Sequence, residues 1–221
     1  MAQPQRGRLQ QGLAGRARGR TFRRCANYAS AAACNWLLPA AASGSLCLAC
    51  GLNRTIPDLS VAENGPLWGK VEAAKRQLVA QLLTLGLPIR RSQAAGDGGL
   101  AFDLLAPAAD GAPLLTGHNR GLITLNIREA DDAYRDRVRE AMHEPYRTLL
   151  GHFRHEIGHF YWDQLVRDGG WLDDFRQRFG DERQDYAAAL EAHYAKGNDG
   201  GDWAKNYVSA YAAAHPWEDW A

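Results

Sequence analysis

Two histidines and a glutamate in the segment His155-Glu156-Ile157-Gly158-His159 are the residues best suited to chemistry. Histidines at positions i and i+4 of a helix project from the same side, so their ring nitrogens can bind one zinc ion at about 2.0–2.1 Å. Zinc lowers the pKa of a bound water to about 7. A glutamate beside the first histidine can accept the proton of that water. The motif therefore predicts a hydrolytic zinc site with His155 and His159 as ligands and Glu156 as general base.

A third ligand must come from further along the chain, because a catalytic zinc keeps three protein ligands and one open position. The extended motif with a glycine and a third histidine is absent, since Trp162 and Leu165 occupy those positions. Glu218 is the best choice, because a carboxylate on a later helix is the gluzincin arrangement. His152 lies on the same helix face as the pair and is expected to be a polar neighbour rather than a further ligand. The full set of candidates for the third ligand is Glu182, Asp185, His193, His215, Glu218 and Asp219.

The four cysteines lie within residues 22–52 and are candidates for a second metal site: Cys25, Cys34, Cys47 and Cys50. The pair Cys47 and Cys50 is followed by Gly51, a pattern that lets two thiolates converge on one ion. This spacing favours a zinc ribbon, and four unrelated reduced thiols are the alternative because the first gap is long. Four cysteines are too few for a disulfide scaffold, so we expect a reducing compartment.

The composition is that of a globular protein with room for one substantial domain and a small module. The chain has 221 residues, of which 46% are hydrophobic and 23% are charged. It lacks the run of about 18 apolar residues that a membrane-spanning helix requires. It also lacks an apolar segment after the basic N-terminus, which a secretory signal would need. We therefore expect a cytoplasmic protein with no membrane span.

Residues 1–21 form a basic arm rich in glutamine, glycine and arginine. The first 24 residues hold seven arginines and no acidic residue. Such a segment buries too little surface to offset the entropy lost on ordering, so we expect disorder. A weak contact with nucleic acid or a partner protein is one role for the arm. A solvated tail is the alternative, favoured because the arm has no aromatic residues that could stack on bases.

Hydrophobic periodicity indicates which elements position these residues. Apolar residues at helical spacing predict a helix over residues 67–85 and another from about 145 to 167, which carries the histidines opposite an apolar face. An edge strand is expected at residues 121–127, where an extended peptide could add by backbone hydrogen bonds; an internal strand is the alternative. Other expected strands are 87–91 and 100–105, and other expected helices are 171–178, 181–196, 202–213 and one beginning at Pro216.

Long segments of the chain extend these motifs: GLITLNI, EPYRTLLGHFRHEIGHFYWDQL, FGDERQDYAAALEAHYA and VSAYAAAHPWEDWA. With the cysteine module, they resemble the gluzincin-like zinc-binding metallopeptidases of bacteria that carry an N-terminal zinc ribbon, over residues 22–221. The resemblance implies an α+β fold with a zinc-ribbon-like module at 22–56 and a zincin-like, mainly helical domain with a small sheet at 57–221. It implies a catalytic zinc on His155, His159 and Glu218, and a second, structural zinc on the four cysteines.

The resemblance also implies hydrolysis of peptide bonds in a peptide or protein substrate. In zincins with a similar helix, a tyrosine seven residues before the glutamate ligand donates to the transition-state oxyanion, and Tyr211 occupies that position; ordinary packing is the alternative. In the family the ligand helix continues beyond this motif, whereas the sequence stops at Ala221. We therefore expect Glu218 on a short helix end and the sequence to be a fragment or a truncated product. The competing function is a zinc-stabilised binding or regulatory module with a zincin fold and little peptidase activity.

Overall fold

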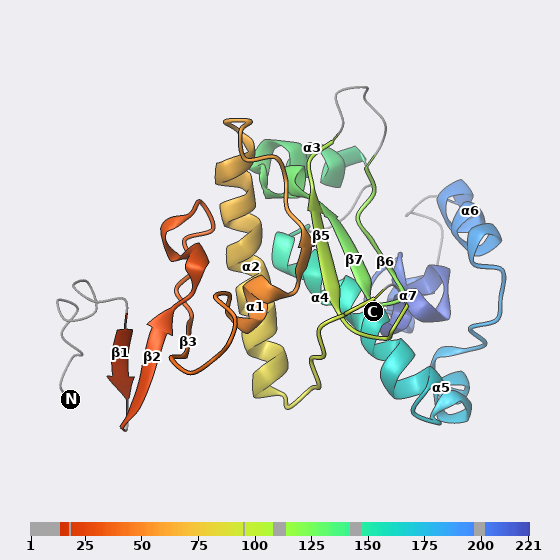
Figure 1. Cartoon of the computed structure of the whole chain (residues 1–221). Coiled ribbons are helices and arrows are strands. Elements are labelled where there is room, and N and C mark those ends of the chain that lie inside the picture. Colours follow the sequence, from red (N-terminus) through yellow and green to blue (C-terminus); the bar gives the residue numbers. More distant parts are fainter. Residues whose placement is uncertain (1–13, 18, 95, 108–113, 142–146, 197–201) are drawn as a thin grey trace, which may run out of the picture.

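The computed structural model describes residues 14–17, 19–94, 96–107, 114–141, 147–196 and 202–221. It is an α+β protein, as the sequence predicts: a four-stranded sheet packs against long helices, and a separate three-stranded sheet lies on the N-terminal side (Figure 1). None of the helices in these residues combines the length and apolar character that a membrane crossing requires.

The N-terminal module begins with an antiparallel sheet of β1 (Ala14–Ala17), β2 (Arg20–Arg24) and β3 (Leu37–Pro39), in that order. A short helix, α1 (Leu48–Gly51), then leads into β4 (Asn53–Thr55). The disorder predicted for residues 1–21 does not hold for β1, because pairing with β2 satisfies its backbone groups. Gly19, at φ +77°, allows the tight turn between the two strands. Residues 1–13 and 18 of the basic arm lie outside the described residues.

The larger sheet has the order β4, β5 (Ala101–Leu105), β7 (Leu122–Asn126) and β6 (Gly117–Asn119). The first three strands are parallel, and β6 runs antiparallel to β7. The prediction of an edge strand at 121–127 is wrong, because the short segment β6, which has no strand signal in its sequence, pairs outside β7. The strand predicted at 87–91 is reduced to one bridge between Arg91 and Leu100, since Pro88 has no N–H to donate to a ladder.

One face of this sheet packs on two long helices, α2 (Asn64–Thr84) and α4 (Leu149–Tyr161). The side chains of a strand alternate between faces, and the positions facing these helices are buried: Phe102, Leu104, Ile123 and Leu125. The ring of Phe102 meets the ring of Phe153 in α4 edge-on, with centroids 5.7 Å apart. The main core therefore fixes α4 beneath the sheet.

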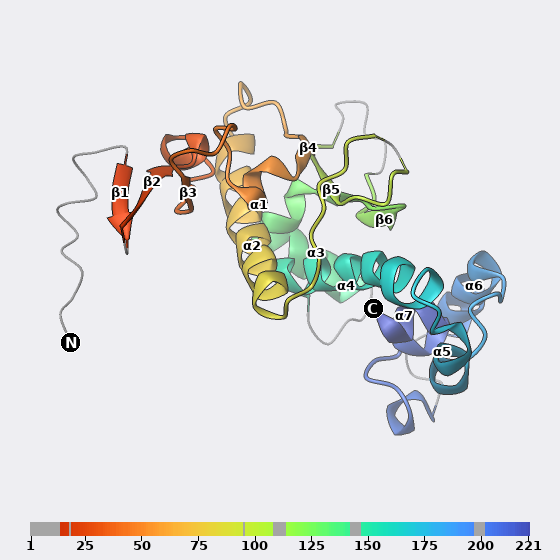
Figure 2. The same ribbon diagram turned by 60° about the horizontal axis from the view of Figure 1, so that its bottom comes forward.

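The C-terminal part is helical. α4 continues as a wider π-helical turn over Trp162–Arg167, so this helical segment ends where the sequence predicts. α5 (Leu172–Phe179), α6 (Tyr186–Lys196) and α7 (Pro216–Trp220) follow, and Figure 2 shows them grouped around the C-terminal half of α4. The helix predicted at 202–213 is replaced by short 3-10 turns at Asp202–Lys205 and Ala212–Ala214. The Ser209 hydroxyl accepts a hydrogen bond from the Ala212 N–H and favours a local turn over a helix.

A second, smaller aromatic core holds α7 in place. Trp162 in the π-helical turn and Phe175 in α5 are both buried in it. The ring of Trp217 lies 5.3 Å from that of Trp162, and the ring of Trp220 lies 6.1 Å from that of Phe175. Since α7 has five residues, these ring contacts rather than its own hydrogen bonds must fix its position.

Candidate metal centres

α4 presents two histidines on the side that faces away from the main core. The Thr148 hydroxyl accepts a hydrogen bond of 3.0 Å from the Gly151 N–H and caps the first turn. The predicted apolar face, with Phe153 and Phe160, is buried. His155 and His159 are therefore left half-buried at the surface of the helix, and their Nε2 atoms lie 3.2 Å apart.

Glu218 reaches this histidine pair from α7. His215 caps that helix, because its Nδ1 accepts a hydrogen bond of 3.2 Å from the Trp217 N–H. Oε2 of Glu218 lies 3.0 Å from Nε2 of His155 and 3.7 Å from Nε2 of His159. A tetrahedral ion with bonds of about 2.0–2.1 Å separates its ligand atoms by about 3.3–3.4 Å. The three separations bracket that value, so the site has the dimensions of a metal centre.

The close approach of α7 to α4 depends on Gly158, between the two histidines. A Cβ atom at this position would lie 2.9 Å from Cα of Ala221. Its carbonyl oxygen accepts a hydrogen bond of 2.9 Å from Nε1 of Trp220. The glycine of the histidine motif thus lets the helix that carries Glu218, the third member of the cluster, lie against α4.

The chemistry of the donor set also fits a metal ion. Oε2 of Glu218 is buried, yet it accepts no hydrogen bond from any residue that the structure describes. Buried carboxylate oxygens normally have a hydrogen-bond donor or a cation as partner, so this oxygen is suited to binding a cation. Two imidazoles and one carboxylate leave a fourth position free, which is the pattern of a catalytic rather than a structural zinc site.

The pKa values of the two carboxyl groups near the histidines, Glu218 and Glu156, are shifted in opposite directions. Burial by itself raises the pKa of Glu218, but the closely approaching imidazoles of His155 and His159 outweigh it and hold that pKa well below its usual range. At Glu156 burial dominates, the charge of Glu218 adds to it, and the pKa is raised. Glu218 therefore stays ionised as a ligand requires, and Glu156 is a stronger base than an ordinary glutamate.

Sequence reasoning missed Tyr186, in the first turn of α6. Its hydroxyl donates a hydrogen bond of 2.7 Å to Oε1 of Glu218. The residue lies within the segment FGDERQDYAAALEAHYA, but no spacing rule connects it to a glutamate so far along the chain. Tyr186 occupies one carboxylate oxygen and so directs the other toward the histidines.

Tyr211 lies next to the same site. Its ring centroid is 6.0 Å from that of His155, and its hydroxyl lies close to that of Tyr186. Burial, together with the charge of Glu218, raises its pKa above the ordinary value. Tyr211 therefore keeps its proton at neutral pH and remains a hydrogen-bond donor.

The other candidate ligands are placed elsewhere. Glu182 accepts a hydrogen bond of 2.9 Å from Arg176, and the Asp185 carboxylate accepts one of 3.0 Å from the Ala188 N–H in α6. Nδ1 of His152 lies 3.5 Å from a carboxylate oxygen of Glu129. The remaining three also serve other contacts or stand outside the cluster: His193, His215 and Asp219. Among the described residues, only Glu218 joins the histidines in a cluster of metal-ligand atoms.

His118, which the sequence did not single out, comes from the edge strand β6. Its ring is stacked parallel to that of His159, with centroids 6.4 Å apart. Burial lowers its pKa to about 4, and the neighbouring His159 contributes to the shift. His118 is thus a neutral ring that links β6 to the histidine site.

The four cysteines form a second cluster, in the N-terminal module. All four are buried, and their sulfur atoms lie within 4.8 Å of one another. Sγ of Cys34 lies 3.6 Å from Sγ of Cys47, close to the separation of about 3.7–3.8 Å in a tetrahedral site with Zn–S bonds of about 2.3 Å. Backbone N–H groups of Cys47 and Cys50 donate to Sγ of Cys25 and Cys47. A hydrogen bond from Cys47 lowers the pKa of Cys50 to about 6, whereas burial raises the pKa of Cys34 to about 11 and the hydrogen bond to Cys50 raises that of Cys47.

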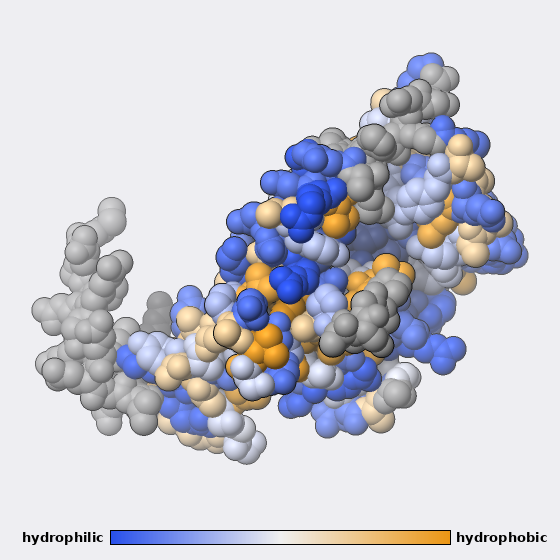
Figure 3. Space-filling view, turned by 90° about the horizontal axis from the view of Figure 1, so that it is seen from above, coloured by the Kyte–Doolittle hydropathy of each residue, from blue (hydrophilic) through white to orange (hydrophobic). Residues whose placement is uncertain are grey.

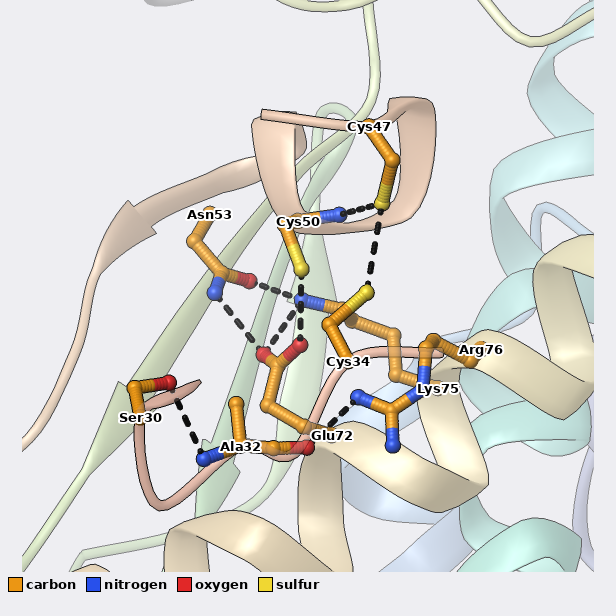
Figure 4. Close-up of polar contacts among 9 residues, drawn as sticks. All are labelled: Ser30, Ala32, Cys34, Cys47, Cys50, Asn53, Glu72, Lys75 and Arg76. Atoms are coloured by element: carbon orange, nitrogen blue, oxygen red, sulfur yellow. Dashed lines mark hydrogen bonds and ion pairs between the residues drawn. The ribbon is translucent and has the colours of Figure 1, made fainter. Parts of the chain in front are cut away.

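A buried polar network joins this cluster to α2 and the larger sheet (Figure 4). The Lys75 ammonium is fully buried and donates to Oε1 of Glu72, at 2.6 Å, and to Oδ1 of Asn53. Asn53 in turn donates to the same oxygen of Glu72, at 2.8 Å. Sγ of Cys50 lies 3.7 Å from Oε2 of Glu72. The network gives both buried charges partners and packs the cysteine module against the rest of the chain.

Comparison with known proteins agrees with these two centres. Residues 64–221 match the family described as "Putative zinc-binding metallo-peptidase", and residues 2–61 match a zinc-ribbon domain. Uncharacterised proteins of Mycobacterium bovis and Mycobacterium tuberculosis are 44% identical over 198 residues, which is 89% of this chain. The matched region is 57% of each relative, so the chain spans little more than half their length. No solved structure matches the chain. The prediction that zinc is the cofactor is confirmed.

Proposed function

The chain belongs to the zinc-binding metallo-peptidase family, and on that premise we propose that it hydrolyses peptide bonds at the site formed by α4 and α7. The observation that carries this proposal is the convergence of three ligand atoms, from His155, His159 and Glu218, within 4.8 Å of one another. Glu156, next to the first histidine, supplies a base in the same place. We assign the fold to the zincins and the ligand set to the gluzincin type.

Each residue has a separate task in this mechanism. When bound, zinc supplies the Lewis acidity that polarises a substrate carbonyl and acidifies a water molecule. Glu156, with its raised pKa, accepts the proton of the attacking water and passes it to the leaving amine. Tyr211 stays protonated and donates to the oxyanion as the carbonyl becomes tetrahedral. Tyr186 holds Glu218 through its second oxygen.

The edge strand β6 supports binding of an extended substrate. Its inner side pairs with β7 in the described sheet, and its outer side has no strand neighbour there. A peptide can add to such an edge by backbone hydrogen bonds. His118 places this strand against His159, so a peptide on β6 would pass the histidine site. Figure 3 shows a hollow on the face seen from above, between the part built on the sheet and the lobe with α6.

A peptide-library digest tests the proposal. Zinc-loaded wild type is expected to cleave a subset of peptides, and Glu156→Gln to cleave them at least 100-fold more slowly, because the amide cannot accept the proton of water. Zinc content measured on both proteins is the control, since the ligands are unchanged. Equal cleavage by the two proteins would contradict the role of Glu156, and absence of cleavage by the wild type would contradict peptidase activity.

A further inference from the structure

The face of the larger sheet opposite α2 and α4 carries a pocket that the proposed mechanism does not use. It has a volume of about 720 Å³. Ala101 and Leu122 line it, whereas the next residues along their strands, Phe102 and Ile123, are buried against the helices. Because side chains of a strand alternate between faces, the pocket lies on the far side of the sheet from the main core.

Among the described residues that line the pocket, arginine is the only charged type. Arg54, Arg91 and Arg120 all contribute to it, and no acidic residue does. Arg54 is neutralised, because its guanidinium forms a two-point ion pair with the buried carboxylate of Asp103, with Nε 2.9 Å from Oδ1. Within the described ranges, the side chains of Arg91 and Arg120 form no direct hydrogen bond or ion pair. The pocket therefore contains two arginines that have no direct ion-pair partner among the described residues.

Arg120 occupies a backbone position that arginine rarely takes. It is the first residue of the two-residue turn between β6 and β7, with φ +47°, followed by Gly121 at φ +88°. A left-handed conformation costs a residue with a Cβ roughly 1 kcal/mol or more, which is why glycine or asparagine is usual there. A Cβ at position 121 would lie 2.1 Å from the carbonyl oxygen of Gly99, so the turn is packed tightly in place. The packed turn thus holds Arg120 in a strained backbone conformation at the end of the edge strand.

This turn also connects the pocket to the histidine site. Arg120 follows His118, the residue stacked on His159, by two positions, which is roughly 7 Å along a strand. Arg120 further lines a smaller pocket of about 300 Å³ together with Phe160 and Asp163, which follow His159 in the helix. A peptide that runs off β6 at its Asn119 end therefore passes Arg120.

The smaller pocket does not compete for an anion. Arg167, in its lining, is bound by both acidic neighbours: its Nη1 is 2.6 Å from Asp163, and its Nε is 2.9 Å from Asp168. These three side chains together carry one negative charge, and the charge of Arg120 acts on Asp163 only at longer range, with no ion pair between the two among the described residues. Of the two pockets, the larger one, lined by Arg91 and Arg120, is therefore the one with a net positive lining.

We infer that Arg91 and Arg120 form a subsite for a carboxylate of the peptide substrate, about two to four residues from the scissile bond. This inference rests on the proposed peptidase function. Guanidinium groups bind carboxylates by paired hydrogen bonds, and these two exposed arginines, which have no direct ion-pair partner in the described residues, are available for this contact. The carboxylate is that of an acidic side chain or that of the substrate C-terminus.

Binding of matched peptides distinguishes the two sources. The probes are short peptides with acetylated N-termini in three forms: one internal Glu with an amidated end, Gln in its place, and Gln with a free C-terminal carboxylate. Binding is measured by fluorescence anisotropy on zinc-loaded Glu156→Gln protein, and kcat/KM is measured on the wild type. We expect one carboxylate form to bind at least tenfold more tightly than the neutral peptide.

Two variants test whether Arg91 and Arg120 cause the preference for a peptide that carries a carboxylate. Arg120→Asn removes the charge and keeps a residue that tolerates positive φ, and Arg91→Gln removes the other charge. Each is expected to reduce the preference to threefold or less, and Arg178→Gln, an exposed arginine on α5, is the matched control that should leave both the preference and kcat on neutral peptides unchanged. Equal binding of all three peptides, or an unchanged preference in both variants, would overturn the subsite. If neutral peptides are cleaved without preference, only the subsite fails. If no peptide is cleaved, the peptidase function fails and the binding preference alone decides the subsite.

Discussion

The hydroxyl of Tyr186 donates a hydrogen bond of 2.7 Å to Oε1 of Glu218, and this leaves Oε2 of the same carboxylate facing the two histidines. The carboxylate is thereby oriented before any ion binds. A residue that orients a ligand is generally worth about 10–100-fold in metal affinity. The contact links α6 to α7 at the site. Although α6 has no buried residue of its own, it therefore helps to orient the Glu218 carboxylate.

Removing this hydroxyl is expected to weaken zinc binding. In Tyr186→Phe the carboxylate loses its fixed orientation, and we predict a rise of about 10–100-fold in the zinc dissociation constant of the histidine site. Competition with a chromogenic chelator measures it, with the cysteine-bound ion counted separately. Tyr207→Phe, which lies outside the cluster, is the control. An unchanged dissociation constant in Tyr186→Phe would contradict the orienting role.

Gly158→Ala is expected to separate α7 from α4. The new methyl group would lie 2.9 Å from Cα of Ala221, so the C-terminal helix must shift, and overpacking of this kind costs about 1–3 kcal/mol. In an unobstructed helix the same change would stabilise the protein by up to about 1 kcal/mol. The prediction is a lower free energy of unfolding together with weaker zinc binding at the histidine site.

Urea unfolding and zinc titration check both parts. Gly44→Ala is a suitable control, because an added Cβ there meets no atom within 4 Å. A Gly158→Ala protein that is more stable than the wild type and binds zinc as tightly would show that α7 does not depend on this close approach.

The buried pair of Lys75 and Glu72 predicts a strongly non-additive mutant cycle. Lys75→Met leaves the Glu72 carboxylate buried without its cation, which costs about 3–5 kcal/mol. Replacing both residues, as Lys75→Met with Glu72→Gln, removes the unpaired charge and should recover more than half of that loss. The measurement is urea unfolding at saturating zinc. Equal losses of unfolding free energy in Lys75→Met and in the double variant would show that the unpaired Glu72 charge is not the cause of the loss.

The local half of the histidine site can be predicted from sequence, and the distant half cannot. His155 and His159 are placed by helix geometry alone, because four residues make about one turn. Spacing leaves six candidates for the third ligand, and only the gluzincin arrangement and the family resemblance favour Glu218, because its position depends on tertiary packing of Trp217 and Trp220. No periodicity in the sequence relates Tyr186 to Glu218.

The errors in the fold also have local causes. β6 has only three residues and a polar sequence, so hydrophobic alternation could not reveal it. For that reason the strand next to it, β7, was expected at the edge. The helix expected at 202–213 had helix-forming alanines, but the hydrogen bond between the Ser209 hydroxyl and the Ala212 N–H offers the backbone a competing turn.

The central claim is that His155, His159 and Glu218 hold one zinc ion, distinct from the ion of the cysteine cluster. Zinc content per chain, measured after dialysis against a mild chelator, tests it most directly. We predict two zinc ions for the wild type and one for His155→Ala, His159→Ala and Glu218→Ala, with His193→Ala keeping two as the control. Two ions retained in the Glu218→Ala protein, with affinity unchanged, would contradict the account.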